Sequence, residues 1–414
     1  MRDPMSEIDV VVTGLGAITP LGGDVPSTWD ALLEGRSGIR GDVLAGTEDA
    51  VLSAVPAGTM AVDPATLLPA VQAKRLDRSQ QAALAAAAEA WADAGAPAVD
   101  PDRLASAIGT GIGGVETLLR EDDVLEQSGA RRVSPRTVPM LMPNAAAALV
   151  SIAYDARAGA YTPVSACSSG AEAIAMGARL IRAGEADVVI AGGTEAAITP
   201  LTIAGFKQAR SLSHHAGDPA SASRPFAADR SGFVLGEGAA ILVLESAAHA
   251  AARGARVHAV IAGAGIAADA HHLTAPAPDG SGQASAMRKA LAQAGLSPAA
   301  VAHVNAHATG TPVGDTAEAL AIREVFGRIP VTAPKASLGH LFGAAGAIEA
   351  LISVLSVEHG VIPPTRNLTP ETIDPEVGLD VVTERRDAPQ RAVLSNSFGF
   401  GGQNVSLVIT SEAA

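Results

Sequence analysis

The chain has 414 residues, a length that accommodates two or three domains or one large α/β unit. Hydrophobic residues make up 48% of it and aromatic residues only 3%, so the core must be packed mainly from Ala, Val, Leu and Ile. The net charge of −14 argues against a surface built to neutralise nucleic-acid phosphates, and an acidic partner would need a local basic patch.

The cysteine content and the apolar stretches of the sequence indicate the redox setting and the absence of targeting segments. A single cysteine, Cys167, excludes an intramolecular disulfide and fits a reducing, cytoplasmic setting. Residues 1–9 are polar and lack the apolar region of a leader, and no window offers about 18 continuous apolar residues. We therefore expect no leader and no membrane-spanning segment.

Short β-rich runs alternate with longer Ala-rich runs along the chain, which is typical of helices laid on a largely parallel sheet. Strands are predicted at 10–13, 105–109, 163–166, 188–191, 240–244, 257–263, 302–305, 331–333, 393–396 and 405–409. Helices are predicted at 79–94, 168–183, 283–294, 316–326 and 343–357. Polar stretches with Gly and Pro at 39–70, 211–232 and 363–390 predict loops.

An internal echo suggests a division of the chain. Residues 11–16 (VVTGLG) and 260–265 (VIAGAG) each look like a strand that runs into a glycine turn. The echo predicts a duplication with a boundary near residue 253, giving halves 1–253 and 254–414.

Cys167 lies in the segment 163–170 (PVSACSSG), where a predicted strand ends and a long helix begins. The unpaired N–H groups at a helix N-terminus stabilise a thiolate and lower its pKa below the usual value of about 8.5. A small buried hydrophobic residue is the ordinary alternative for a lone cysteine. The position among Ser and Gly at a strand-to-helix junction favours a nucleophile.

Two histidines also lie at strand ends beside Gly-rich turns. His307 precedes residues 308–312 (ATGTP), and His340 closes the segment 335–340 (KASLGH). Lys335 is one of only four lysines, which indicates a role that arginine would not fill, although a surface lysine beside a structural histidine is the alternative. Ligands gather at strand ends of α/β sheets, so these residues and Cys167 predict one site.

Other motifs point away from cofactors. Residues 109–114 (GTGIGG) match a dinucleotide-binding pattern, but no acidic residue follows near position 134. His303 and His307 have the spacing of a helical metal pair, but their segment alternates like a strand and no second Cys completes a site. No GxSxG elbow supports a serine hydrolase. The turn at 396–402 (NSFGFGG) offers backbone N–H groups to an oxyanion.

Four motifs resemble, in order and spacing, those of the β-ketoacyl-[acyl-carrier-protein] synthases, synthase II above all. They are 164–170, 305–315 (NAHATGTPVGD), 335–340 and 396–402, and the segment 224–238 fits as well. The resemblance covers nearly the whole chain. It implies an α/β thiolase fold of two pseudo-symmetric halves in five αβαβα layers, usually a homodimer.

This resemblance implies a decarboxylative Claisen condensation without cofactor or metal, which lengthens an acyl chain by two carbons. Cys167 would take the acyl group from acyl carrier protein, and malonyl carrier protein would lose CO2 to give an attacking enolate. His307 and His340 would hydrogen-bond the malonyl thioester carbonyl. Lys335 would tune and anchor both histidines.

The resemblance also implies binding residues. The backbone N–H groups of Cys167 and Phe400 would form the oxyanion hole. Pantetheine would contact Thr309 and Thr311, and the acyl pocket would be lined by Ile112 and Phe206 with Phe400 as its gate. Carrier docking would use the basic residues Arg131, Arg132 and Arg210.

Some positions depart from the family pattern. Ala308 stands where Gly is common and Gln403 where Thr or His is usual, which affects the entrance for the pantetheine arm. The segment 211–215, with His214 and His215, departs from the usual polar loop near the docking surface.

Related classes can be separated by single residues. A degradative thiolase needs a second catalytic cysteine, and a synthase III would carry Asn at His340. The catalytic subunit of a type II polyketide or polyene heterodimer has identical chemistry and stays open as an alternative. A non-catalytic chain-length partner usually lacks the nucleophile, so Cys167 argues against it. We expect acyl- and malonyl-loaded carrier protein as partners, and neither nucleic acid nor membrane.

Overall fold

The computed structural model describes residues 9–44 and 49–411. Residues 1–8, where the sequence predicts no leader, and residues 45–48 in the predicted loop 39–70 lie outside the described residues, as do 412–414. The strands up to residue 246 are β1 (Val10–Ile18), β2 (Ala57–Gly58), β3 (Leu104–Gly109), β4 (Gly159–Tyr161), β5 (Val188–Glu195), β6 (Leu235–Gly236) and β7 (Gly238–Ser246). The helices up to residue 252 are α1 (Val25–Leu33), α2 (Ala50–Ser53), α3 (Ala70–Ala73), α4 (Arg78–Asp93), α5 (Val115–Ser128), α6 (Thr137–Leu141), α7 (Ala145–Tyr154), α8 (Ser169–Arg182), α9 (Pro200–Gln208) and α10 (Ala247–Ala252).

The rest of the chain adds a second set of elements. Its strands are β8 (Ala259–Ala268), β9 (His303–Asn305), β10 (Pro330–Thr332), β11 (Val361–Ile362), β12 (Asp380–Val381), β13 (Arg386–Asp387), β14 (Ala392–Gly399) and β15 (Gln403–Thr410). Its helices are α11 (Ser281–Ala294), α12 (Pro312–Phe326), α13 (Lys335–Leu338) and α14 (Ala345–His359).

The two sets of strands have the same topology. The sheet order is β12-β10-β9-β14-β15-β8-β1-β7-β5-β3-β4, so β1-β7-β5-β3-β4 matches β8-β15-β14-β9-β10. In both, the first three strands pair antiparallel and the last three parallel. The halves meet where β1 pairs with β8. The predicted boundary near residue 253 lies between β7 and β8 and stays a prediction.

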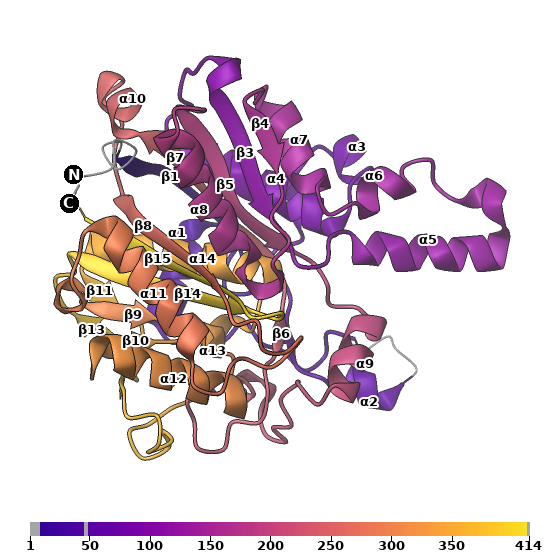
Figure 1. Ribbon diagram of the computed structural model, residues 1–414. Coiled ribbons are helices and arrows are strands. Elements are labelled where there is room, and N and C mark those ends of the chain that lie inside the picture. Colours follow the sequence, from indigo (N-terminus) through magenta and orange to yellow (C-terminus); the bar gives the residue numbers. More distant parts are fainter. Residues whose placement is uncertain (1–8, 45–48, 412–414) are drawn as a thin grey trace.

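Helices form three layers around the two halves of the sheet (Figure 1). In the middle, α8 and α14 pack on each other and on strands of both halves. On one outer side α4 packs on β1 and β7, and on the other α11 packs on β8 and β15. The five αβαβα layers of the thiolase fold are therefore confirmed.

Glycines in β1 and β8 explain the echo seen in the sequence. A Cβ on Gly16 would lie 2.0 Å from the Ala86 carbonyl oxygen of α4, and one on Gly265 would lie 2.0 Å from the Ala286 carbonyl oxygen of α11. The echo thus marks equivalent places where a helix packs directly on the strand backbone. The predicted glycine turns are wrong, because both strands continue through these residues.

Most predicted elements are present, with two kinds of exception. The predicted strand at 163–166 is wrong: β4 ends at Tyr161, and the chain is irregular before the Cys167 turn. Pro163 has no backbone N–H to donate a hydrogen bond to a neighbouring strand, and Val164 is 56% exposed.

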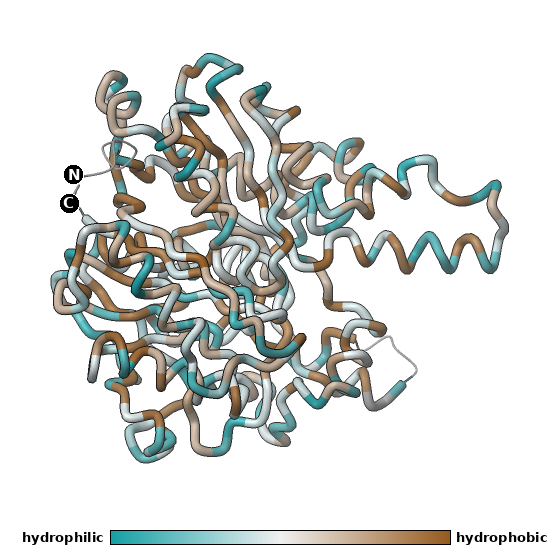
Figure 2. The backbone as a smooth tube through the Cα atoms, viewed as in Figure 1, coloured by the Kyte–Doolittle hydropathy of each residue, from teal (hydrophilic) through white to brown (hydrophobic). Residues whose placement is uncertain are grey.

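The patterns in the sequence do not predict the helices α1, α5, α7 and α9. Figure 1 shows α5 as an arm that leaves the body, and Figure 2 shows hydrophilic and hydrophobic residues alternating along it.

One stretch, Phe342–His359, is long and apolar enough to cross a membrane by length and composition, with a mean hydropathy of 1.2. It comprises the turn η8 (Phe342–Ala344) and α14, and 89% of it is buried within the fold. Its position between the two halves of the sheet accounts for its apolar character.

Candidate active site

A tight turn presents Cys167 at the start of the central helix α8. The residue lies in the 3-10 turn η5 (Ala166–Ser168), and Ala166 has a φ of 53°, a conformation that is strained for a residue with a Cβ. The Ser168 hydroxyl donates to the Ser165 carbonyl (2.8 Å), and the Ser169 hydroxyl donates to the Ala166 carbonyl (2.7 Å). The serines around Cys167 therefore hold the turn.

The end of β14 packs against this turn. A Cβ on Gly399 would lie 2.5 Å from the Ser165 carbonyl oxygen and 3.1 Å from the Cys167 nitrogen, so only glycine allows the approach. The backbone N–H groups of Phe400 and Cys167 both act on the Cys167 sulfur. Two N–H donors thus flank the thiol, as the predicted oxyanion hole requires.

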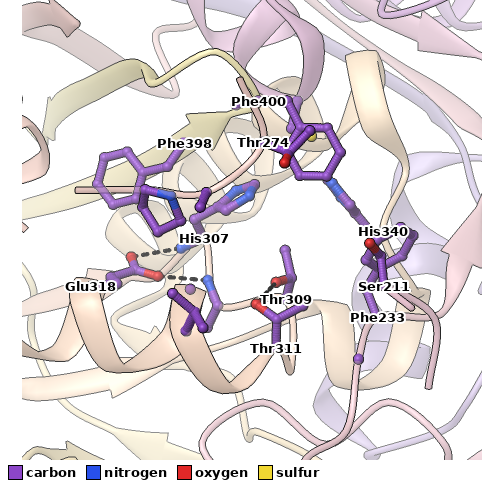
Figure 3. A pocket seen from close by; sticks show the side chains of 18 of the residues that line it. Ser211, Phe233, Thr274, His307, Thr309, Thr311, Glu318, His340, Phe398 and Phe400 are labelled. Atoms are coloured by element: carbon purple, nitrogen blue, oxygen red, sulfur yellow. Dashed lines mark hydrogen bonds between the residues drawn. The ribbon is translucent and has the colours of Figure 1, made fainter. Parts of the chain in front are cut away.

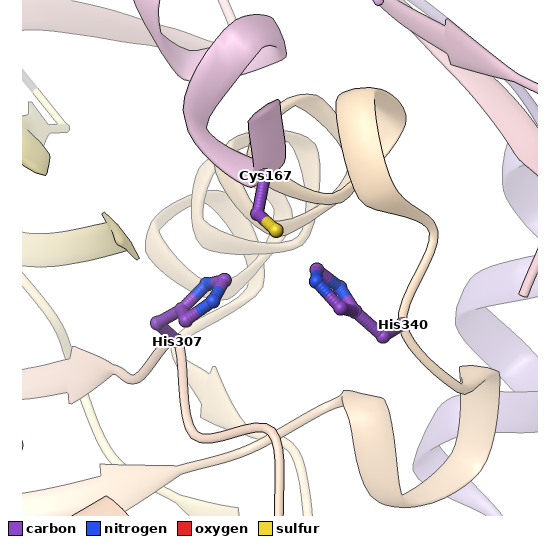
Figure 4. A group of neighbouring side chains, drawn as sticks. All are labelled: Cys167, His307 and His340. Atoms are coloured by element: carbon purple, nitrogen blue, oxygen red, sulfur yellow. The ribbon is translucent and has the colours of Figure 1, made fainter. Parts of the chain in front are cut away.

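Three elements bring the predicted nucleophile and histidines together (Figure 4). The Cys167 sulfur and one ring nitrogen each of His307 and His340 all lie within 4.8 Å of one another. His307 follows β9, and His340 lies between α13 and η8. The imidazole rings stand edge to face, with centroids 5.3 Å apart.

The two histidines are held by different groups. Lys335 Nζ lies 3.2 Å from His307 Nδ1 and also donates to the Glu349 carboxylate of α14. The His340 ring stacks on Phe342 at 4.8 Å, and its backbone N–H donates to the Val234 carbonyl (2.7 Å). Lys335 thus contacts His307 directly, whereas the resemblance implied that it would anchor both histidines.

Both imidazoles are neutral near pH 7. Burial, and then the Lys335 charge and the neighbouring His340, hold the pKa of His307 well below its usual value. Burial and Lys335 do the same to the pKa of His340. Because His307 Nδ1 accepts from the Lys335 ammonium, the ring hydrogen of His307 is on Nε2. This nitrogen is then a hydrogen-bond donor.

The predicted low pKa of Cys167 is wrong. Burial raises the pKa of this thiol to about 12, since only 4% of the residue is exposed, although the Lys335 charge and the Phe400 N–H act in the opposite direction. The resting side chain is a thiol, so its attack on a thioester requires a proton acceptor. The neutral imidazole of His340 is the acceptor within reach, because Nε2 of His307 already carries a hydrogen.

Buried carboxylates hold the backbone of the site, and sequence reasoning missed them. Glu318 of α12 accepts the backbone N–H groups of His307 (2.8 Å) and Ala308 (2.7 Å), as Figure 3 shows. Glu318 also accepts from the side-chain amide of Asn396 (3.2 Å). Burial raises its pKa to about 7.

A second carboxylate, Glu195 at the end of β5, occupies the Gly-rich turn that resembles a dinucleotide motif. It accepts the backbone N–H groups of Gly111 (2.6 Å) and Gly343 (3.1 Å) and the hydroxyl of Thr110 (3.1 Å). Burial raises the pKa of Glu195 to about 7. The N–H groups that would bind a phosphate thus hold a protein carboxylate instead.

A cavity of about 380 Å³ leads to the cluster (Figure 3). Cys167, His307, His340, Thr309, Thr311 and Phe400 are among its lining residues. The hydroxyls of Thr309 and Thr311 lie 3.0 Å apart. Phe206 packs in the apolar cluster around Cys167, whereas Ile112 is 37% exposed and does not line this cavity.

The predicted docking residues lie on separate elements. Arg131 and Arg132 belong to the turn η4 (Ala130–Arg132) beyond the α5 arm, and Arg210 follows α9 at the cavity. All three are exposed. Gln403, a departure from the family pattern, is exposed at the start of β15. His215 of the 211–215 segment contacts the Ser221 hydroxyl (2.9 Å).

Sulfur and imidazole nitrogen are also zinc ligands, and the cluster of Cys167, His307 and His340 is the group with such spacing in the described part of the chain. The ammonium of Lys335, 3.2 Å from His307 Nδ1, disfavours a second cation there.

Comparison with known proteins agrees with this geometry. Residues 7–250 match the family model described as beta-ketoacyl synthase, N-terminal domain, and residues 258–369 match its C-terminal domain. The chain belongs to the β-ketoacyl synthase family. It is therefore an enzyme of the acyltransferase class.

Three relatives span nearly the whole chain. The 3-oxoacyl-[acyl-carrier-protein] synthase 2 of Mycobacterium bovis is 46% identical over 402 residues, 96% of each chain. The crystal structure of a beta-ketoacyl synthase from Burkholderia phymatum has a TM-score of 0.89 and 35% identity, covering 98% of this chain and 100% of that one. The ishigamide ketosynthase/chain length factor has a TM-score of 0.88 and 32% identity, with 98% and 99% covered.

Proposed function

We propose that this β-ketoacyl synthase condenses an acyl group carried on Cys167 with malonyl-[acyl-carrier-protein], releasing CO2 and lengthening the chain by two carbons. The observation that carries the proposal is the cluster of one thiol and two neutral imidazoles within 4.8 Å, at the end of a cavity that reaches the surface loops. The printed name of the Mycobacterium bovis relative supports the carrier protein as partner.

In the first half-reaction the Cys167 thiol attacks the acyl thioester and passes its proton to His340. The bond between the acyl group and the carrier sulfur then breaks, and the leaving carrier thiolate takes up this proton. The backbone N–H groups of Cys167 and Phe400 stabilise the oxyanion of the tetrahedral adduct. Phe400, 36% exposed beside the cavity, gates the acyl pocket together with Phe206. Ile112 stays a prediction for this pocket, because its backbone N–H contacts Glu195 and it does not line the described cavity.

In the second half-reaction His307 and His340 donate to the malonyl thioester oxygen, where charge develops as CO2 leaves. Lys335 makes His307 a donor at Nε2 by occupying Nδ1. Neutral imidazoles suit this role, because a neutral N–H donor stabilises the charge that develops on the oxygen without giving up its proton. Thr309 and Thr311 bind the pantetheine arm, and Arg131, Arg132 and Arg210 bind the acidic carrier protein.

The quaternary structure is part of the proposal. We favour a homodimer, and a heterodimer with a ketosynthase-like partner is the second candidate, which the likeness to a ketosynthase/chain length factor favours. Sedimentation of the purified chain alone decides: a stable dimer that condenses without a second protein supports the homodimer. A monomer that gains activity only with a partner supports the heterodimer.

Intact-protein mass spectrometry tests the reaction itself. After incubation with acyl carrier proteins of different chain lengths, one acyl mass is expected on the wild-type chain and none on Cys167→Ala, since no other thiol exists. Malonyl carrier protein should then discharge the acyl mass as ketoacyl product. Equal ketoacyl product from Cys167→Ala would contradict the proposed function.

A further inference from the structure

Two phenylalanine rings pack against the imidazole of His340. The Phe342 ring stacks on it, with centroids 4.8 Å apart and planes at 17°. The Phe233 ring meets it edge to face, at 5.6 Å and 88°. Both phenylalanines are buried and belong to the apolar cluster around Cys167. We call Phe233 and Phe342 the aromatic wall of His340.

A hydrogen bond fixes the ring of His307, whereas the ring of His340 lacks one of this kind. His307 Nδ1 lies 3.2 Å from Lys335 Nζ. His340 Nδ1 is buried and has no hydrogen-bond partner among the described residues. The backbone of His340 is fixed, because its N–H donates to the Val234 carbonyl (2.7 Å) and its carbonyl accepts from the Gly236 N–H (2.8 Å). Ring contacts are therefore what restrict the rotation of the His340 side chain.

An Nδ1 that no described group fixes suits the two roles of His340 in the proposed function, on which this inference rests. His340 accepts the Cys167 proton during loading and donates to the malonyl thioester oxygen during decarboxylation. A cation at Nδ1 would confine the ring hydrogen to Nε2, as Lys335 does in His307, and Nε2 could then not accept a proton. Stacking orients an imidazole in either tautomer.

Phe342 is itself held firmly by its surroundings. Its φ of 46° is strained for a residue with a Cβ, and such a conformation persists only where the neighbouring structure imposes it. The next residue, Gly343, donates its N–H to the Glu195 carboxylate (3.1 Å), and a Cβ there would lie 2.3 Å from the Gly111 nitrogen. On its other side the Phe342 ring packs on Phe206, with centroids 5.1 Å apart. The ring can therefore act as a fixed surface.

We propose that Phe342 is a positioning residue whose ring holds the His340 imidazole in the orientation that the proposed reaction uses. Phe233 supports the same imidazole from a second side. A phenyl ring neither gives nor takes a proton, so the effect of Phe342 on the rate passes through His340. The chain thus orients its two histidines by different means, with a buried cation for His307 and the aromatic wall for His340.

A double-mutant cycle between Phe342 and His340 tests this proposal. Two variants, Phe342→Leu and Phe342→Met, keep an apolar side chain and remove the flat ring, and either one serves if the other does not fold. The rate is that of malonyl decarboxylation, followed as labelled CO2 from malonyl carrier protein. We compare the Phe342 variant, His340→Ala and the double variant with wild type, because such a cycle measures whether two residues act through one another.

In the presence of His340, loss of the Phe342 ring should lower kcat by about tenfold, since misplacing a catalytic group by about 1 Å can cost up to about 100-fold. The KM for malonyl carrier protein should stay within about twofold of wild type, because the ring orients a reacting group and does not bind the carrier. In the His340→Ala background the same substitution should change the rate by less than about twofold. A ring that served only to hold the fold would lower the rate in both backgrounds.

Two controls accompany the cycle. In the His307→Ala background the Phe342 substitution should keep its full effect, because Lys335 and not Phe342 holds His307. Phe226→Leu is the matched variant, since Phe226 is fully buried, also has a positive φ (64°) and lies in a different apolar cluster. It should leave decarboxylation within about twofold of wild type.

The outcomes are distinct. An equal loss with and without His340 would overturn the positioning role of Phe342, and so would an unchanged rate in a folded Phe342 variant. Absence of CO2 release and of ketoacyl product from the wild type would instead overturn the proposed function.

Discussion

At the scale of single residues, the buried cation of Lys335 determines what the histidines can do. It fixes the hydrogen of His307 on the nitrogen that faces Cys167, and it adds to burial, the larger cause, in keeping both imidazoles neutral. Decarboxylation builds charge on the malonyl thioester oxygen, whereas loading depends on Cys167 and on a different pair of N–H donors. The two half-reactions therefore respond to different substitutions.

We predict that His307→Ala and His340→Ala each reduce malonyl decarboxylation by about 100-fold. One oxyanion donor contributes about 3 kcal/mol, which corresponds to that factor. Acyl loading of Cys167 should persist at a measurable rate. Single-turnover assays that follow labelled CO2 and acyl-enzyme mass separately provide the measurement, and a histidine variant that decarboxylates normally but cannot load would refute the assignment.

A second prediction concerns the Lys335–Glu349 ion pair, which is almost fully buried. Lys335→Met should lower the free energy of unfolding by about 3 kcal/mol at pH 8, because it leaves Glu349 unpaired in the core. Burial raises the pKa of Glu349 to about 7 even beside Lys335. Without Lys335 its folded pKa is higher still, so the variant should recover stability as the pH falls to 6.

Urea unfolding at both pH values measures this effect. The double variant Lys335→Met with Glu349→Leu should regain most of the stability at pH 8 and remain poor at decarboxylation. Equal loss of stability at pH 6 and pH 8 in Lys335→Met would contradict the burial of an unpaired carboxylate.

At the scale of elements, helix α11 rests on the backbone of β8 and α4 on that of β1. We predict that Gly265→Ala lowers the free energy of unfolding by about 3 kcal/mol, because the new Cβ would lie 2.0 Å from a carbonyl oxygen of α11. Gly205→Ala in α9 is the control, since no atom lies within 4 Å of its added Cβ. That change should be neutral or stabilise by about 0.5 kcal/mol.

His258 joins three elements, and its effect on stability should depend on pH. Its ring nitrogens contact Asp93 of α4 (2.9 Å) and Glu358 of α14 (2.8 Å), just before β8. Although burial lowers it, these carboxylates raise the pKa of His258 to about 9. A raised folded pKa means that the stabilisation is complete below the unfolded value of about 6.5 and disappears as the pH rises through 9.

We therefore expect His258→Gln to cost about 2–3 kcal/mol at pH 6, at about 1.4 kcal/mol for each pKa unit, and little at pH 10. Denaturant unfolding of both proteins across this range provides the comparison. His271→Gln, a change at an exposed residue, should have no effect at either pH. A His258→Gln penalty that is constant with pH would show that packing, not charge, explains the contact.

At the scale of the whole molecule, local patterns predicted the sheet and the central helices because their periodicity reflects burial. The same reasoning could not find Glu195, Glu318 or Glu349, because an acidic residue on an Ala-rich element looks like a solvated one. Glu195 meets its partner Gly111 84 residues away, and Glu318 and Glu349 meet His307 and Lys335 on other elements 11 and 14 residues away, so each pairing exists only after folding. The wrong prediction of a low pKa for Cys167 has the same origin. The sequence indicated that Cys167 lies at the start of a helix, but it did not show how deeply the thiol is buried.

The docking surface belongs to this scale too, because it must offset the net charge of −14 locally. We predict that charge reversal at Arg131, Arg132 and Arg210 raises the KM for acidic carrier protein several-fold and weakens its salt dependence, since exposed charges mainly steer association. The three residues lie on η4 and after α9, so each reversal should be measured singly. An acyl thioester without carrier protein is the control substrate, and its turnover should stay unchanged. If charge reversal slows the turnover of both substrates equally, these arginines support the fold and do not bind the carrier.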